Sequence, residues 1–140
     1  MTSPLEALAG PGRALRSEPP DAREFANHLR SAEVALRDAQ HEELSLETRF
    51  FLAYRAAYSL CLAALRYRGF RPANRIIVFQ ALPHTLGLGP DVWRVLAKAH
   101  QVRNASEYEG ESRAEVRLLH DLMNAVLRVK KAVEKLPPLA

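Results

Sequence analysis

Residues 45–69 read SLETRFFLAYRAAYSLCLAALRYRG, and this stretch decides the fold. Ser45 suits a helix N-cap and Gly69 suits the residue after a helix C-terminus, so the stretch predicts one helix that ends near Arg68. Its apolar side chains form two stripes at helical spacing, namely Phe51, Tyr54, Tyr58, Cys61 and Leu65, and Phe50, Ala53, Ala57, Leu60, Ala64 and Tyr67. A narrow polar strip remains, made of Arg55, Ser59 and Arg66. A helix that is apolar nearly all round must be covered on most sides, so we expect it at the centre of the fold or at a subunit interface.

Four more helices are predicted around this central one. Asp21, with Glu24 three residues later, resembles a capping box at the start of the first. A shorter helix is expected over residues 74–82, limited by Pro83, although its β-branched residues leave a strand open. We prefer a helix there because no second strand is predicted to pair with it. The fourth helix should begin near Pro90 and break at Gly110, and the last should run over residues 112–136.

These elements predict one all-α domain, an up-and-down bundle of four to five helices over residues 21–136. Residues 1–20 hold Pro4, Pro11, Pro19 and Pro20 and are expected to form a flexible leader, and residues 137–140 a tail. No apolar run is long enough for a membrane span or typical of a signal peptide, so we expect a cytoplasmic protein. The single cysteine, Cys61, is expected to be a buried, inert thiol.

Charge is unevenly distributed along a chain whose net charge is +4. Residues 21–47 contain three arginines and seven acidic residues, whereas residues 46–80 contain six arginines and one acidic residue. Two interpretations compete. The acidic first helix and the basic central helix neutralise each other within the fold, or the arginines form a phosphate-binding surface, which suits the planar guanidinium group.

A second polar cluster lies at the end of the fourth helix. Helical spacing brings His100, Arg103, Asn104 and Glu107 close together, and Tyr108 adds an aromatic ring with a hydroxyl. Arginine can clamp a phosphate, asparagine can bond a base and tyrosine can stack on it, as is usual in RNA-binding sites. The alternative is an ordinary helix-end ion pair between Arg103 and Glu107.

Two segments together resemble the HEPN domain family, the nucleotide-binding domain of higher eukaryotes and prokaryotes. Residues 53–72 are similar to its second helix and following turn, and Arg103-Asn104 with Glu107-Tyr108 resembles its later arginine motif. The resemblance covers about residues 24–110. It implies a helical bundle that dimerises with the two arginine motifs facing each other, and, in active members, metal-independent RNA cleavage by the arginine and a histidine. Here Tyr108 stands at the histidine position, which marks a non-canonical form.

We therefore expect an RNA- or nucleotide-binding module, of the kind found in toxin–antitoxin or defence systems. The expected ligand-binding residues are Arg103, Asn104, Glu107, Tyr108 and Arg55, and Arg103, Tyr108 and His100 are the candidates for a catalytic role. Neither a metal nor a cofactor is expected. The resemblance also implies a homodimer and a small nucleotidyltransferase as partner.

Apolar surface gives a separate reason to expect a homodimer. The central helix and the stripe from Leu119 to Val133 present more apolar surface than a small bundle can cover. Two alternative functions remain open, a metal-independent RNA-cleaving toxin and a structural bundle that binds a partner protein.

Overall fold

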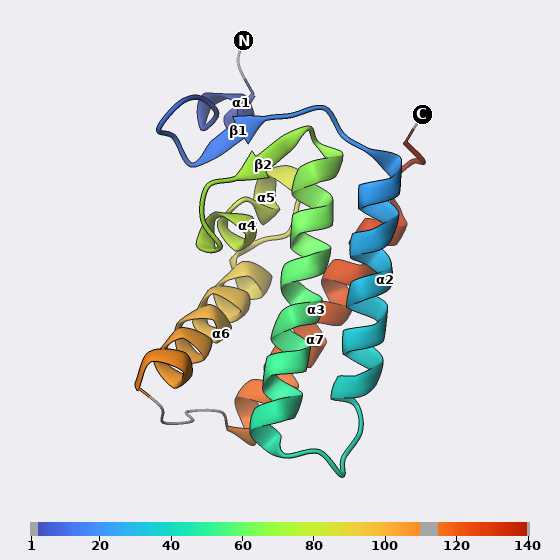
Figure 1. The fold of residues 1–140 in the computed structure, drawn as a ribbon, viewed down its shortest axis with the longest axis vertical. Coiled ribbons are helices and arrows are strands. Elements are labelled where there is room, and N and C mark those ends of the chain that lie inside the picture. The colour runs from blue at the N-terminus through green and yellow to red at the C-terminus, as the bar shows by residue number, and fades with distance from the viewer. Residues whose placement is uncertain (1–2, 110–114, 140) are drawn as a thin grey trace.

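Four long helices that alternate in direction form the body of the protein (Figure 1). This computed structural model describes residues 3–109 and 115–139, with side chains up to residue 106 in the first range. The long helices are α2 (Ala22–Ala39), α3 (Leu46–Tyr67), α6 (Pro90–Glu109) and α7 (Val116–Glu134). The prediction of an all-α up-and-down bundle is confirmed.

Shorter elements cap one end of this bundle, where both ends of the chain also lie (Figure 1). They are α1 (Pro4–Ala7), β1 (Leu15–Ser17), β2 (Phe70–Pro72), α4 (Ile76–Gln80) and α5 (Leu82–Thr85). The strands β1 and β2 pair antiparallel, with Leu15 opposite Pro72. The sequence predicted neither strand, because each has only three residues and their pairing joins distant parts of the chain.

The helix ends follow local sequence signals. The Asp21 carboxylate accepts a hydrogen bond from the backbone N–H of Arg23 at 2.8 Å, and the Ser45 hydroxyl accepts one from that of Thr48 at 3.1 Å. Gly69 has a φ of 90°, which suits glycine and turns the chain from α3 into β2. The short helix predicted over residues 74–82 is shorter in the structure, where α4 ends at Gln80. Pro83 lies in the first turn of α5, where its missing N–H is not needed.

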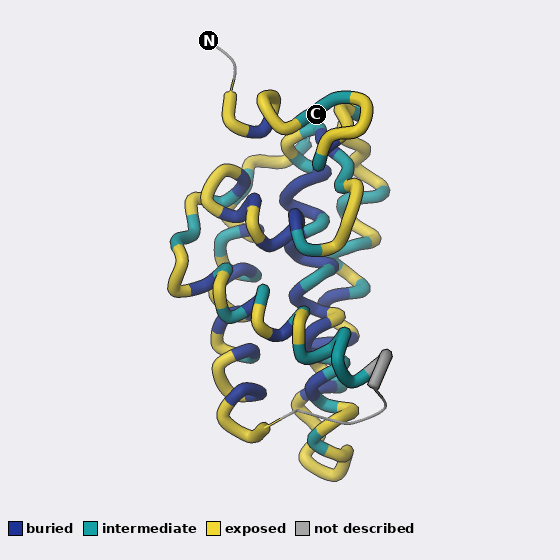
Figure 2. Tube along the Cα trace, turned by 90° about the vertical axis from the view of Figure 1, so that its left-hand side faces the viewer, coloured by how far each residue is buried: buried dark blue, intermediate teal, exposed yellow. Residues whose placement is uncertain are grey.

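Helix α3 is the centre of the molecule, as predicted, since it contacts α2, α4, α5, α6, α7 and β2. Its apolar side chains are buried, including Phe50, Cys61 and Leu65, and the buried positions gather along the inner sides of the helices (Figure 2). The stripe of α7 from Leu119 to Val133 is buried as well. One chain thus covers both apolar faces. Excess apolar surface is therefore no longer a reason to expect a dimer.

Residues 3–20, called here the N-terminal strap, pack against the bundle, which corrects the prediction of a flexible leader. Leu5 and Leu15 are buried, and β1 pairs with β2. The backbone carbonyls of Glu18 and Pro19 accept hydrogen bonds from the Arg66 guanidinium at 3.0 and 2.7 Å. The high proline content suggested disorder, but the strap is anchored by contacts far along the sequence, which composition does not reveal.

If the strap contributes to stability, Leu15→Ala should lower the free energy of unfolding by about 2 kcal/mol, since it removes a fully buried side chain. Leu8→Ala is the control, because Leu8 is 37% exposed and its truncation should cost less than about 1 kcal/mol. Urea denaturation followed by circular dichroism measures both. Equal, small losses would show that the strap adds nothing to stability.

Candidate functional site

A surface pocket of about 510 Å³ lies where α2, α3, α6 and the start of α4 meet. It is lined by three arginines, three aromatic residues and two serines, namely Arg55, Arg75, Arg103, Phe51, Tyr54, Tyr58, Ser31 and Ser59. We call it the arginine–tyrosine pocket. No acidic residue is among the described residues that line it. The charge of the pocket therefore favours an anionic ligand.

Helical spacing on α3 builds one wall of this pocket. Phe51, Tyr54, Arg55 and Tyr58 stand at positions i, i+3, i+4 and i+7, so they share one face of the helix. Arg75 is the residue just before α4, and Arg103 comes from α6. The bundle thus brings together cations from three separate segments.

Two of the arginines lie over tyrosine rings. The guanidinium carbon of Arg75 is 5.0 Å from the centroid of the Tyr58 ring, and that of Arg103 is 5.6 Å from the centroid of the Tyr54 ring. Such cation–π contacts orient a guanidinium against the ring. Arginine is also a favoured partner of phosphate, because its planar fork matches the phosphate oxygens.

A hydrogen-bonded chain of side chains links α6 to α3 behind the pocket. Tyr54 Oη is 2.9 Å from His100 Nδ1, and His100 Nε2 is 3.2 Å from Asn104 Nδ2. The Asn104 carbonyl oxygen accepts a hydrogen bond from Arg103 Nη1 at 3.4 Å. His100 also stacks on Tyr54, with ring centroids 6.1 Å apart. His100, Arg103 and Asn104 therefore form one connected group.

The protonation states in this group follow from burial and from the nearby arginines. Burial lowers the pKa of His100, and the positive charges of Arg103 and Arg75 lower it further, so the imidazole is held neutral. Burial raises the pKa of Tyr54 although Arg75 and Arg103 oppose that change, so the phenol keeps its hydrogen at neutral pH. Both side chains are therefore neutral and act through hydrogen bonds.

The structure brings together His100, Arg103 and Asn104, as helical spacing predicted. Of the predicted site residues, Arg103 and Arg55 line the arginine–tyrosine pocket, whereas His100 and Asn104 do not. The side chains of Glu107 and Tyr108 lie outside the described residues, and so does the alternative ion pair between Arg103 and Glu107. Both residues belong to the backbone of α6.

Six lining residues of the pocket were not selected from the sequence, and four of them carry an aromatic ring or a charge. Phe51, Tyr54 and Tyr58 were assigned to an apolar stripe of the central helix, and Arg75 was noted only as part of a basic segment. The available signal was the spacing of these aromatics around Arg55 on one helical face.

Neither family models, curated proteins nor solved structures match this chain. The function must therefore be argued from the chemistry of the pocket. Within residues 3–109 and 115–139, no three histidine, cysteine, aspartate or glutamate side chains are grouped so that they could hold a metal ion. None of the described helices is long and apolar enough to cross a membrane.

The basic segment of residues 46–80 serves two purposes in the structure. Four of its arginines bind groups of the protein itself. Arg66 and Arg71 bind the Glu24 carboxylate, Arg49 donates to the carbonyl of Ala39, and Arg68 donates to that of Thr85. Neutralisation by Glu24 of the first helix thus accounts for Arg66 of the central helix and for Arg71 of β2. Arg55 and Arg75 instead line the arginine–tyrosine pocket.

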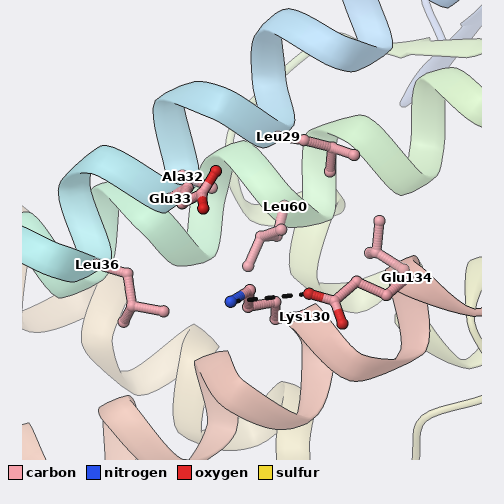
Figure 3. A pocket seen from close by; sticks show the side chains of 8 residues that line it. Leu29, Ala32, Glu33, Leu36, Leu60, Lys130 and Glu134 are labelled. Carbon is pink, nitrogen blue, oxygen red and sulfur yellow. Dashed lines mark ion pairs between the residues drawn. The ribbon is translucent and has the colours of Figure 1, made fainter.

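A second, smaller pocket of about 180 Å³ lies between α2, α3 and α7 (Figure 3). Leu29, Leu36 and Leu60 point into it, and an ion pair of 3.7 Å between Lys130 Nζ and Glu134 Oε1 lies at its edge (Figure 3). Its lining is mainly aliphatic and carries a carboxylate on either side, from Glu33 and Glu134. This pocket suits an apolar side chain better than an anion.

Proposed function

We propose that the protein is an RNA- or nucleotide-binding module and that the ligand binds in the arginine–tyrosine pocket. The observation that carries this proposal is the convergence of Arg55, Arg75 and Arg103 beside aromatic rings in a pocket without a described acidic lining residue. Arginine is well suited to phosphate because its planar fork can donate two parallel hydrogen bonds.

The lining residues divide naturally between the two parts of a nucleotide. The arginines provide donors for the phosphate, and Phe51 and Tyr58, which are both partly exposed, provide rings for stacking a base. A pocket of about 510 Å³ also falls within the size range of small-molecule sites. An unpaired nucleotide of an RNA and a free nucleotide both meet these requirements.

The HEPN resemblance supports the same function and adds proposals about assembly. As in that family, we propose a homodimer and a small nucleotidyltransferase partner within a toxin–antitoxin or defence system. We expect binding rather than cleavage, because Tyr108 stands where active members have histidine. His100 is a poor replacement, since Tyr54 and Asn104 already occupy both of its ring nitrogens.

Substitution of the pocket arginines tests the proposal. We expect Arg55→Gln, Arg75→Gln and Arg103→Gln each to weaken binding of a short fluorescein-labelled oligouridine, measured by fluorescence anisotropy across a salt series. Each should also reduce the slope of log affinity against log salt by about one, because each removes one phosphate contact.

Arg94→Gln is the matched control. Arg94 lies on α6, as Arg103 does, but it is exposed, stacks on Trp93 and does not line the pocket. Its replacement should leave binding within about twofold, the effect of a general charge change. Equal losses for all four variants would indicate nonspecific attraction by net charge. If the unmodified protein binds neither oligouridine nor AMP at low salt, the structural-bundle alternative becomes the better one, with the aliphatic pocket of Figure 3 as its contact site.

A further inference from the structure

The hydrogen-bonded chain behind the arginine–tyrosine pocket has a defined direction. Arginine carries only donors, so the atom of Asn104 that faces Arg103 Nη1 must be the carbonyl oxygen. The Asn104 amide nitrogen then faces His100, at 3.2 Å from Nε2. Since that nitrogen is a donor, His100 Nε2 must accept.

This assignment fixes the tautomer of His100. A neutral imidazole carries one N–H, and because Nε2 accepts, the hydrogen is on Nδ1. Nδ1 is 2.9 Å from Tyr54 Oη, so the imidazole donates and the phenol oxygen accepts. The hydrogen of the Tyr54 hydroxyl is consequently not used in the bond to His100.

Arg75 also acts on the Tyr54 oxygen as a hydrogen-bond donor, so both neighbours of this oxygen donate to it. No acceptor for the hydroxyl hydrogen is found in the part of the chain that the structure describes. Tyr54 lines the pocket, with Arg103 over its ring and Arg75 over the ring of Tyr58 one turn further along α3. Tyr54 therefore interacts with two cations, Arg75 and Arg103, and lines the pocket with both of them.

We propose that the Tyr54 hydroxyl donates a hydrogen bond to a phosphate oxygen bound between Arg75 and Arg103, with Asn104 and His100 as positioning residues that keep it a donor. This inference rests on the proposed function and specifies which part of the pocket binds the phosphate. The phosphate comes from an RNA phosphodiester or from a terminal phosphate, since both present the acceptor oxygens that this site requires.

The tautomer can be measured directly. In protein labelled with ¹⁵N at histidine, the shifts and long-range proton couplings of the His100 ring should show a protonated Nδ1 and an unprotonated Nε2. A protonated Nε2 with a bare Nδ1 would overturn the inference, because Tyr54 would then donate to His100.

Binding tests the donor itself. We expect Tyr54→Phe, which keeps the ring, to bind labelled oligouridine about tenfold more weakly, as expected for a lost hydrogen bond to a charged group. Tyr67→Phe is the matched control, because the Tyr67 hydroxyl donates to the carbonyl of Pro137 at 2.7 Å and is not part of the pocket. It should bind as the unmodified protein does.

The probe is used with a 5′-hydroxyl and with a 5′-phosphate. Equal affinity for both assigns the site to a phosphodiester, and tighter binding of the phosphorylated form assigns it to a terminal phosphate. If the unmodified protein binds both probes and Tyr54→Phe binds them equally well, this inference is wrong while the proposed function stands. If the unmodified protein binds neither of these probes nor AMP, the proposed function falls and the phosphate site falls with it.

Discussion

Arg66→Met should lower the free energy of unfolding by about 3 to 5 kcal/mol, because it breaks a buried ion pair and leaves several hydrogen-bond acceptors without their donor. The Arg66 side chain is only 2% exposed and donates to the Glu24 carboxylate at 3.0 Å. It also donates to the backbone carbonyls of Glu18, Pro19 and Phe70. Methionine fills similar volume but leaves these acceptors without their donor.

Arg16→Met provides the matched control. Arg16 pairs with the Glu18 carboxylate at 3.5 Å, but its side chain is 71% exposed, so its loss should cost less than about 0.5 kcal/mol. Both variants are measured by urea denaturation at neutral pH. A loss of less than about 1 kcal/mol for Arg66→Met would mean that Arg66 does not anchor the strap.

Acidification should lower the free energy of unfolding by about 3 kcal/mol through Glu24 alone. Burial acts to raise the pKa of Glu24, but hydrogen bonds from Arg71, His28 and Arg66 outweigh it and hold the pKa at about 2, against an ordinary 4.5. A carboxyl whose pKa is lowered by folding stabilises the folded state fully above its unfolded pKa. This stabilisation is therefore lost as the pH falls from about 4.5 to about 2. Glu18, whose pKa is lowered chiefly by its bond to Arg71, acts in the same direction.

Glu24→Gln isolates this contribution. The variant should be less stable at pH 7, and its stability should fall less steeply below pH 5, so the two curves should approach each other in acid. Glu33→Gln is the control, since Glu33 is an exposed residue of the same helix. If the free energy of unfolding of Glu24→Gln and of the unmodified protein changed in parallel with pH, Glu24 would not be the group that titrates.

The long helices could be predicted because their signals are local. Asp21, Ser45 and Gly69 each mark a helix end through bonds or backbone angles that involve only neighbouring residues. The strands β1 and β2 could not, because three-residue strands carry no periodic pattern and depend on each other. Asp21 does cap α2, but Glu24, expected to complete a capping box, turns to Arg66 and Arg71 instead.

The site was only partly predictable for a similar reason. The cluster of His100, Arg103 and Asn104 follows from helical spacing within α6. Its connection to Tyr54 and Arg75 depends on how α6 packs against α3 and α4, which no local pattern specifies. Arg66 belongs to the polar strip of the central helix, yet it is buried and bonded to the strap, a contact that helical spacing does not specify.

The strap also bears on the order in which the chain folds. Its anchors join Leu15 to Pro72 and Glu18 to Arg66, so they close loops of about fifty residues, and such contacts form slowly compared with helix pairs joined by a short turn. The hairpin of α2 and α3 can assemble first. During synthesis, the strap leaves the ribosome before any other segment described here, yet it has nothing to pair with until β2 has followed. Leu5 and Leu15 are therefore exposed throughout that interval, and this early segment is among the last to become native.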